Sequence, residues 1–387
     1  MLFDDQETDQ DFDDPRTVVG VTTAAGLAAP RETVECLGHG EIERQLLGLI
    51  DEDKLPHALI FAGPEGIGKA TMAFRLARFL LNEKPKDDGP GLFGAALPSL
   101  KPDSMYTPQD APVFRQVATG AHPDLLVIER LMDEKKGKKQ DSVSVEEVRR
   151  VVPFLRMKAA HDGGWRVVIV DDADTMTNQG QNAILKILEE PPPRTVLVLI
   201  AHRPGAMIPT IRSRCRVISF QPPVIDVFRD LVRRNHAGIP DGDIATLYAV
   251  ARGSVGLGIN MLEQGGLESI GKIMALLSAW PRWDWPQIHA QAEIVGRSGS
   301  ENALQSFNVV LQWIVESIVR NRACGQKPTG ILDNEAISGL MNHYSLADWI
   351  QICENLKVHF DTADFANLDK RQAVIGAFSI LDYKEAA

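Results

Sequence analysis

A glycine-rich stretch at residues 63–70, GPEGIGKA, has the spacing of a phosphate-binding loop up to its lysine. It follows an apolar run typical of a buried strand and precedes a helical pattern, which is the context that this motif requires. In such a loop, backbone N–H groups around Gly63, Gly66 and Gly68 surround phosphate oxygens, and Lys69 reaches the outer phosphates. The alternative is a glycine-rich strand-to-helix turn without a ligand. We interpret the loop as a nucleotide-phosphate site.

The residue after the lysine argues against ordinary hydrolysis at this loop. Mg²⁺-dependent nucleotide hydrolysis needs a Ser or Thr hydroxyl there, but the residue is Ala70. Thr71 comes one position later and would point about 100° away around the helix. ATP is therefore a candidate ligand of a degenerate loop, and the sequence predicts no complete set of metal ligands.

A second apolar run ends in Asp171 and Asp172, as the other half of a nucleotide-hydrolysing site would. Asp171 has the position of a residue that helps to hold Mg²⁺, and Asp172 stands where a glutamate would orient the attacking water. The alternative is an acidic turn that caps the helix beginning near Thr175. Both interpretations stay open from these residues alone.

Arg214 lies at a helix end before an apolar run, within the sequence Ser-Arg-Cys. A guanidinium delivered to a neighbouring subunit's nucleotide stabilises the transferring phosphoryl group and raises the rate by a factor of about 10³–10⁵. The alternative is a surface ion pair worth under about 1 kcal/mol, which we favour for the isolated residue.

Short apolar runs separated by helical patterns must position these side chains. Continuous runs of this kind are typical of strands covered on both faces, so the sequence predicts an α/β fold with a parallel sheet. The predicted strands are 58–62, 125–128, 167–170, 196–200 and 217–220. Predicted helices between them include 145–155 and 181–190, and the second ends at Pro191, which cannot continue it.

After Pro223 we find only helical periodicity. The Trp/Pro-rich stretch at 280–286 is interpreted as a linker, and the last hundred residues carry long amphipathic helices. One of these has an apolar stripe at Leu346, Trp349, Ile350 and Cys353. The predicted organisation is a disordered acidic tail at 1–35, an α/β domain at 36–221, a small helical domain at 222–285 and a helical domain at 286–387.

Composition restricts the class of protein. The 387 residues carry 41 basic and 52 acidic side chains, for a formal charge of −11, so a strongly basic coat for nucleic acid is absent. The lysines at 135, 136, 138 and 139 are interpreted as a solvated loop, with DNA contact as the alternative. No signal peptide opens the chain, and no apolar run approaches the roughly 20 residues that span a membrane, so we expect a cytoplasmic protein.

Four motifs in this order resemble the AAA+ module of bacterial clamp-loader subunits. They are the loop ending at Lys69, the acidic strand end at 171–174, the sequence NAILKILEEPP at 182–192 and Ser-Arg-Cys at 213–215. The resemblance covers residues 36–260. It implies a P-loop AAA+ domain with a five-stranded parallel sheet, followed by a small helical lid and an all-α collar that assembles with other subunits.

Within this family the chain resembles the delta-prime subunits of DNA polymerase III clamp loaders. Ala70 and Asp172 replace two residues of the motor subunits, and Gly256 stands where those subunits carry an arginine that contacts ATP. The resemblance implies a stator that supplies Arg214 in trans, with little or no ATPase of its own. Its partners would be the gamma/tau and delta subunits and, through the complex, the sliding clamp and primed DNA.

Other interpretations remain. An active, ATP-hydrolysing motor subunit of the gamma/tau type is the first alternative, and a P-loop kinase of a small metabolite is the second. Many members of the family carry a four-cysteine zinc module after the loop helix, but residues 83–120 contain no cysteine. The four cysteines of the chain are scattered and form no Cys-x-x-Cys pair, so we predict no zinc.

Overall fold

The computed structural model describes residues 28–82, 102–133, 138–161, 163–297, 303–365 and 368–382. These form two compact units, and each has a hydrophobic core of its own. The first unit contains Ala28–Gly63 and Lys69–Phe220, and the second contains Pro64–Gly68 and Gln221–Ala387. The predicted tail up to residue 27 and residues 83–101 of the predicted irregular stretch lie outside the described residues.

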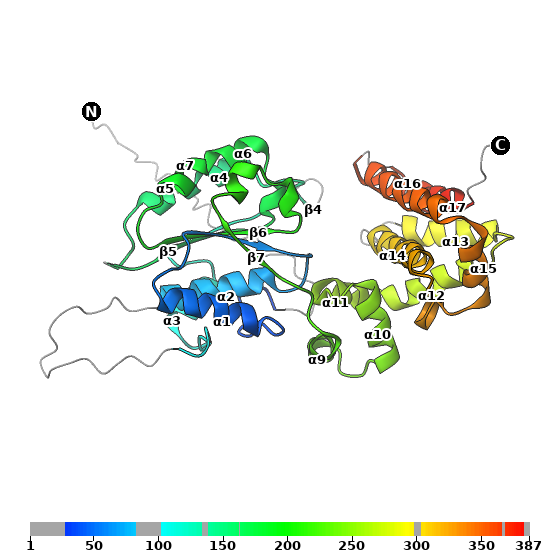
Figure 1. The fold of residues 1–387 in the computed structure, drawn as a ribbon, viewed down its shortest axis with the longest axis horizontal. Helices are drawn as coiled ribbons and strands as arrows, with labels where there is room; N and C mark the ends of the chain where they lie inside the picture. Colours follow the sequence, from blue (N-terminus) through cyan, green and yellow to red (C-terminus); the bar gives the residue numbers. More distant parts are fainter. Residues whose placement is uncertain are drawn as a thin grey trace, which may run out of the picture. The chain divides into compact units, whose positions relative to one another are not determined.

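Five parallel strands form the sheet of the first unit (Figure 1), in the order β2-β5-β6-β1-β7. Their bounds are β1 (Ala58–Ala62), β2 (Leu125–Ile128), β5 (Arg166–Val170), β6 (Thr195–Ala201) and β7 (Arg216–Ser219). Strand β1 lies between β6 and β7. It pairs with β6, Ala58 opposite Leu197, and with β7, Leu59 opposite Arg216. Every residue of β1, β5 and β6 is buried, as continuous apolar strands covered on both faces should be. The predicted five-stranded parallel sheet is confirmed.

Helices cover both faces of this sheet. In Figure 1, α1 (Gly40–Asp51), α2 (Lys69–Leu81) and α3 (Pro112–Ala118) lie on one face. On the other face lie α4 (Val145–Arg149), α5 (Val151–Arg156), α6 (Asn178–Ala183) and α7 (Leu185–Glu189). The single helices predicted at 145–155 and 181–190 are each two short helices, with breaks at Arg150 and Ile184. The remaining helix, α8 (Pro209–Arg212), precedes β7, and 3-10 turns occur at Ala173–Thr175 and Pro204–Ala206.

Two features of the first unit were not predicted. A small antiparallel pair, β3 (Met132–Asp133) and β4 (Lys138–Lys139), follows β2, and the lysines at 135 and 136 lie outside the described residues. Residues 28–35, which the sequence grouped with the tail, pack against α2. The buried Arg78 guanidinium donates to the carbonyl oxygens of Arg31 at 2.9 Å and Thr33 at 2.6 Å. These bonds fix the segment because a buried cation needs acceptors.

All elements described beyond Gln221 are helices, which fits the predicted helical regions. They are α9 (Ile225–Asn235), α10 (Asp241–Val250), α11 (Val255–Glu263), α12 (Gly266–Leu277), α13 (Trp285–Gly296), α14 (Ala303–Cys324), a 3-10 turn (Gly330–Leu332), α15 (Glu335–His343), α16 (Leu346–Phe365) and α17 (Lys370–Leu381). One hydrophobic core extends from Phe228 in α9 to Leu381 in α17. Among the described residues, no helix has the length and apolar character needed to cross a membrane.

The stretch at 280–286 packs into this second unit. The Trp283 indole donates to the Asp382 carboxylate at 3.0 Å and contacts the Phe378 ring. Trp280 contacts the His343 ring. The division into a lid at 222–285 and a collar at 286–387 therefore remains a prediction.

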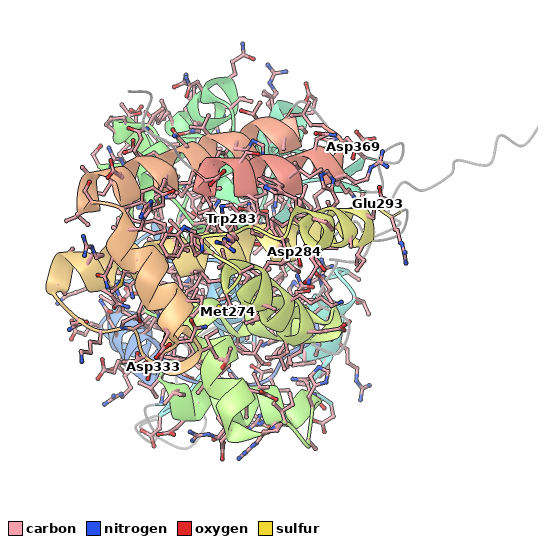
Figure 2. The ribbon with its side chains drawn as sticks, turned by 90° about the vertical axis from the view of Figure 1, so that its right-hand side faces the viewer. Met274, Trp283, Asp284, Glu293, Asp333 and Asp369 are labelled. Atoms are coloured by element: carbon pink, nitrogen blue, oxygen red, sulfur yellow. The ribbon has the colours of Figure 1, made fainter. Side chains whose placement is uncertain are left out.

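Ion pairs also connect helices in this unit. Figure 2 labels Glu293 on α13 and Asp369 directly before α17. Arg371 pairs with both carboxylates, at 3.2 and 2.8 Å. Because these side chains are about half exposed, such pairs contribute at most about 1 kcal/mol, and the buried core carries most of the stability.

Candidate functional site

The phosphate loop connects β1 to α2, and its shape depends on glycine. Gly66 and Gly68 have φ angles of 72° and 104°, in the left-handed region that favours glycine. The Gly63 N–H donates to the Ala201 carbonyl at 3.2 Å, so the loop begins beside the end of β6. The carboxyl ends of parallel strands are where open α/β sheets bind their ligands.

The middle of the loop packs within the second unit. The Gly66 carbonyl accepts the Gly256 N–H at 2.9 Å, and the Glu65 carbonyl accepts the Ser254 hydroxyl at 2.8 Å. A Cβ atom on Gly66 would lie 2.4 Å from Ser254 Oγ. Gly256 thus makes a close backbone contact with the loop. This is the position at which the resemblance implies an arginine in motor subunits.

Lys69, the first residue of α2, is 3% exposed. Its ammonium donates to the Gly63 carbonyl at 2.8 Å and meets His202 Nδ1 at 2.8 Å. The side chain therefore points along the carboxyl edge of the sheet toward the residue that follows β6. Next to it in α2, Ala70 and Thr71 are half-buried in the first turn, and Ala70 brings no oxygen to the site.

Asp171 and Asp172 follow β5, but their carboxylates have opposite environments. Burial, and then the charge of Asp172, raises the pKa of Asp171 to about 6. Burial also acts to raise the pKa of Asp172. This effect is outweighed by the hydrogen bond from His202 and by the charge of Arg130, so the pKa of Asp172 lies well below its usual range. The surroundings of Asp172 therefore stabilise its anionic form, whereas those of Asp171 destabilise its anionic form.

Asp172 is held on two sides. His202 Nε2 lies 2.7 Å from Asp172 Oδ1, and Arg130 Nε donates to Asp172 Oδ2 at 2.6 Å. The Asp172 backbone is left-handed, with φ 51°. In this arrangement the carboxylate is an ion-pair partner, and its two oxygens are already engaged by protein groups.

Asp174 supports the same edge. Its carboxylate accepts the backbone N–H of His202 at 2.9 Å and that of Arg203 at 3.0 Å. This fixes the turn after β6 and with it the position of the His202 ring. The structure thus brings Lys69, Asp171 and Asp172 to one edge, as their placement after strands and at the start of a helix predicted.

Arg214 lies away from this cluster, directly after α8. Its guanidinium donates to Glu189 Oε1 at 2.8 Å and to the Thr210 carbonyl at 3.1 Å. The two charged side chains are 36% and 51% exposed. The surface ion pair considered as the alternative interpretation is therefore present, and it leaves the guanidinium accessible to solvent.

Sequence reasoning assigned no role to Arg130, Glu189 or His202. A signal was available for two of them, because Arg130 and His202 closely follow the predicted strands 125–128 and 196–200. In the described part of the chain, no group of three or more His, Cys, Asp or Glu side chains could hold a metal ion. Residues 83–101 lie outside that part, so the absence of zinc stays a prediction.

Comparisons with known proteins agree with the motifs. Residues 38–224 match the family described as "DNA polymerase III, delta subunit". A DNA polymerase III subunit delta' from Pseudomonas aeruginosa is 36% identical over 159 residues, which cover 41% of this chain and 41% of that protein. A replication factor C small subunit from Methanococcus maripaludis is 22% identical over 292 residues, covering 73% of this chain and 78% of that one.

Among solved structures, a DNA polymerase III gamma subunit-related protein from Thermotoga maritima is 19% identical, with a TM-score of 0.40. The alignment covers 88% of this chain and 98% of that one. The alignment with the Pseudomonas delta' subunit spans only about two fifths of that relative's length. The predicted resemblance of this chain to delta-prime clamp-loader subunits is confirmed by the family match and the delta' relative.

Proposed function

We propose that this chain is a delta-prime-type subunit of a DNA polymerase III clamp loader, a stator that supplies Arg214 to the ATP site of a neighbouring subunit. It would act in the cytoplasm with gamma/tau and delta subunits and, through the assembly, with the sliding clamp and primed DNA. The observation that carries this proposal is the exposed guanidinium of Arg214, presented at the end of α8 apart from the chain's own phosphate loop.

The chain's own site supports a non-hydrolysing role. Ala70 provides no hydroxyl for Mg²⁺, and both oxygens of Asp172 are engaged by His202 and Arg130. Asp171, the remaining acid, is half-buried, and desolvation raises its pKa. A site with these residues has neither a water-orienting carboxylate nor a full set of metal ligands.

Arg214 has the properties that action in trans requires. Its contacts are a solvent-exposed ion pair, one backbone carbonyl and the Ser213 hydroxyl at 3.5 Å, which together hold it weakly. An arginine that approaches the transferring phosphoryl group of a partner exchanges these contacts for charge-assisted bonds to phosphate oxygens. The stabilisation grows as negative charge spreads over the phosphoryl oxygens in the transition state.

The test is ATP hydrolysis by a reconstituted loader with clamp and primed DNA, using wild-type chain, Arg214→Ala and Arg212→Ala. Arg212 is the matched control, because it is an exposed arginine in the short helix α8, two residues before Arg214. We expect Arg214→Ala to reduce the DNA-stimulated rate at least about tenfold, with the assembly intact by gel filtration, and Arg212→Ala to leave it unchanged. An unchanged rate with Arg214→Ala would overturn the arginine role.

The same preparation separates this proposal from that of an active motor subunit. The purified chain alone should show no ATP turnover above background. Turnover that Lys69→Ala abolishes would identify the chain as a hydrolysing subunit instead.

A further inference from the structure

We propose that His202 closes the phosphate loop against nucleotide by holding the Lys69 ammonium inside the protein, so that phosphate groups bind tightly only when His202 is displaced or removed. The inference concerns the chain's own loop and does not depend on the role of Arg214. The ligand class is a nucleoside diphosphate or triphosphate, recognised through its phosphates.

The first step is the engagement of Lys69. A loop lysine contributes to phosphate binding because its ammonium donates to phosphate oxygens. Here the ammonium, 3% exposed, already donates to the Gly63 carbonyl at 2.8 Å and lies 2.8 Å from His202 Nδ1. A phosphate that approaches this lysine therefore has to compete with acceptors that the protein itself provides.

The second step is the protonation state of His202. An ammonium has only donors, so the ring nitrogen that faces Lys69 must be an acceptor without a proton. The other ring nitrogen then carries the proton and donates to Asp172 Oδ1 at 2.7 Å. The network thus assigns one neutral tautomer to His202, with Nε2 protonated.

The third step is the anchoring of the histidine. Asp172 is fixed by Arg130 at 2.6 Å, and Asp174 holds the His202 backbone N–H at 2.9 Å. The His202 and Asp172 side chains are 22% and 8% exposed, so water competes weakly for these bonds. The result is a continuous hydrogen-bonded chain, Lys69–His202–Asp172–Arg130, along the carboxyl ends of β6, β5 and β2.

This chain of contacts satisfies each charge with a protein partner. A phosphate at Lys69 would have to compete with the His202 contact, and breaking that contact would also disturb the bond to Asp172. Removing the imidazole ring removes this competition, while Asp172 keeps Arg130 as its partner. Phosphate binding should then be more favourable. The Lys69 ammonium can donate to a phosphate oxygen the hydrogen bond that it donates to His202 in the wild-type protein.

The test is isothermal titration of the full chain with ADP, without Mg²⁺ because Ala70 offers it no ligand. We expect His202→Ala to bind ADP at least about tenfold more tightly than wild type, which corresponds to about 1.4 kcal/mol. Pyrophosphate should show the same gain and adenosine should not, because the gain arises at the phosphates. Lys69→Ala combined with His202→Ala should abolish it.

Arg203→Ala is the matched control, because Arg203 is the neighbouring residue of the same turn and its side chain is 80% exposed. It should leave ADP affinity unchanged. A His202→Ala chain that binds ADP no more tightly than wild type, including no measurable binding by either, overturns the proposal. His202→Val, whose side chain has no hydrogen-bond acceptor for Lys69, should reproduce the gain if the alanine variant is poorly folded.

An independent measurement uses the wild-type protein. The ¹⁵N chemical shifts of the His202 ring should show an unprotonated Nδ1 and a protonated Nε2 at neutral pH. A protonated Nδ1 would mean that the ring does not accept from Lys69, and the proposal would fail whatever the variants do.

Discussion

At the scale of single residues, two adjacent aspartates differ more than their sequence suggests. Asp172 is paired with a histidine and an arginine, and Asp171 lies half-buried beside it. The sequence placed both residues at the end of one apolar run, but it did not indicate which one would be the stable anion. That distinction depends on Arg130 and His202, which are about 30 to 40 residues away in the chain and become neighbours only when β2, β5 and β6 pair.

Asp171→Asn tests the environment of the Asp171 carboxyl, which desolvation disfavours in its charged form. Its pKa of about 6 in the folded protein exceeds the usual value near 4, so the unfolded chain releases this proton first as the pH rises. Asp171 therefore makes the wild-type protein lose stability between about pH 4 and 6. In urea unfolding, the advantage of Asp171→Asn over wild type should grow across this window by on the order of 2 kcal/mol.

The exposed carboxylate Glu146 offers the control for this comparison. Glu146→Gln removes an exposed carboxylate in the same unit, so the pH dependence of Asp171→Asn is compared with that of this variant as well as with wild type. A constant difference between Asp171→Asn and wild type from pH 4 to 7 would contradict the raised pKa.

The Arg214–Glu189 pair is also a residue-scale feature, and we expect it to be weak. Because the two side chains are 36% and 51% exposed, a double-mutant cycle of Arg214→Ala and Glu189→Ala should give a coupling energy under about 1 kcal/mol in unfolding free energy. The coupling should disappear in about 1 M salt, where the Debye length is about 3 Å.

Glu190→Ala, the neighbouring exposed carboxylate, should show no coupling to Arg214→Ala in the same cycle. A coupling above about 2 kcal/mol for Glu189 would mean that Arg214 is locked on its own chain, and release to a partner would then be costly.

At the scale of elements, the strands were predictable because their composition leaves few choices. Each of the five apolar runs became a strand within one residue at either end, since short continuous runs of β-branched and aliphatic residues suit a sheet covered on both faces. Helix faces were less predictable. Ile350 belonged to the predicted stripe of α16 but is 44% exposed, while Trp349, Ile352 and Leu356 are fully buried.

The physical reason is that periodicity identifies an apolar face only where neighbouring helices cover one side. Helix α16 packs against both α14 and α17, so its buried face is wide and its direction is set by tertiary contacts. The breaks at Arg150 and Ile184 were not predicted, because the sequences on both sides of each break have continuous helical periodicity.

Two glycines in helices of the second unit provide an element-scale prediction. A Cβ atom on Gly258 in α11 would lie 2.6 Å from the buried Phe228 ring, whereas one on Gly271 in α12 would meet nothing within 4 Å. Gly258→Ala should therefore lower the unfolding free energy by about 1–3 kcal/mol through overpacking. Gly271→Ala should raise it by about 0.5–1 kcal/mol, because alanine loses less backbone entropy than glycine.

We would measure the thermal unfolding of Gly258→Ala, Gly271→Ala and the wild-type protein, and compare their unfolding free energies. The substitution and the secondary structure are the same, so only the local space differs. Equal effects of the two variants would show that the close approach of α9 and α11 does not exist.

At the scale of the whole molecule, the division into two cores has a spectroscopic consequence. Five of the six tryptophans (280, 283, 285, 313 and 349) lie in the second unit, and only Trp165 lies in the first. Tryptophan fluorescence therefore reports mainly on the helical unit, whereas far-ultraviolet circular dichroism reports on both. We expect Gly258→Ala to lower the midpoint of the fluorescence transition and to shift only one part of the dichroism transition.

Gly271→Ala should move the same fluorescence transition in the opposite direction. If both probes instead follow one coincident transition in every variant, the two cores unfold as a single cooperative unit.

The position of β1 also bears on how the chain is made. Its partners are Leu197 in β6 and Arg216 in β7, opposite Ala58 and Leu59, so the centre of the sheet is assembled from segments far apart in the chain. At a synthesis rate of about 5–20 residues per second, the apolar strand Ala58–Ala62 leaves the ribosome on the order of ten seconds before it can pair. During that interval it is an exposed hydrophobic segment with unpaired backbone groups, and a chaperone that shields it would act before the residues around Arg214 have been synthesised.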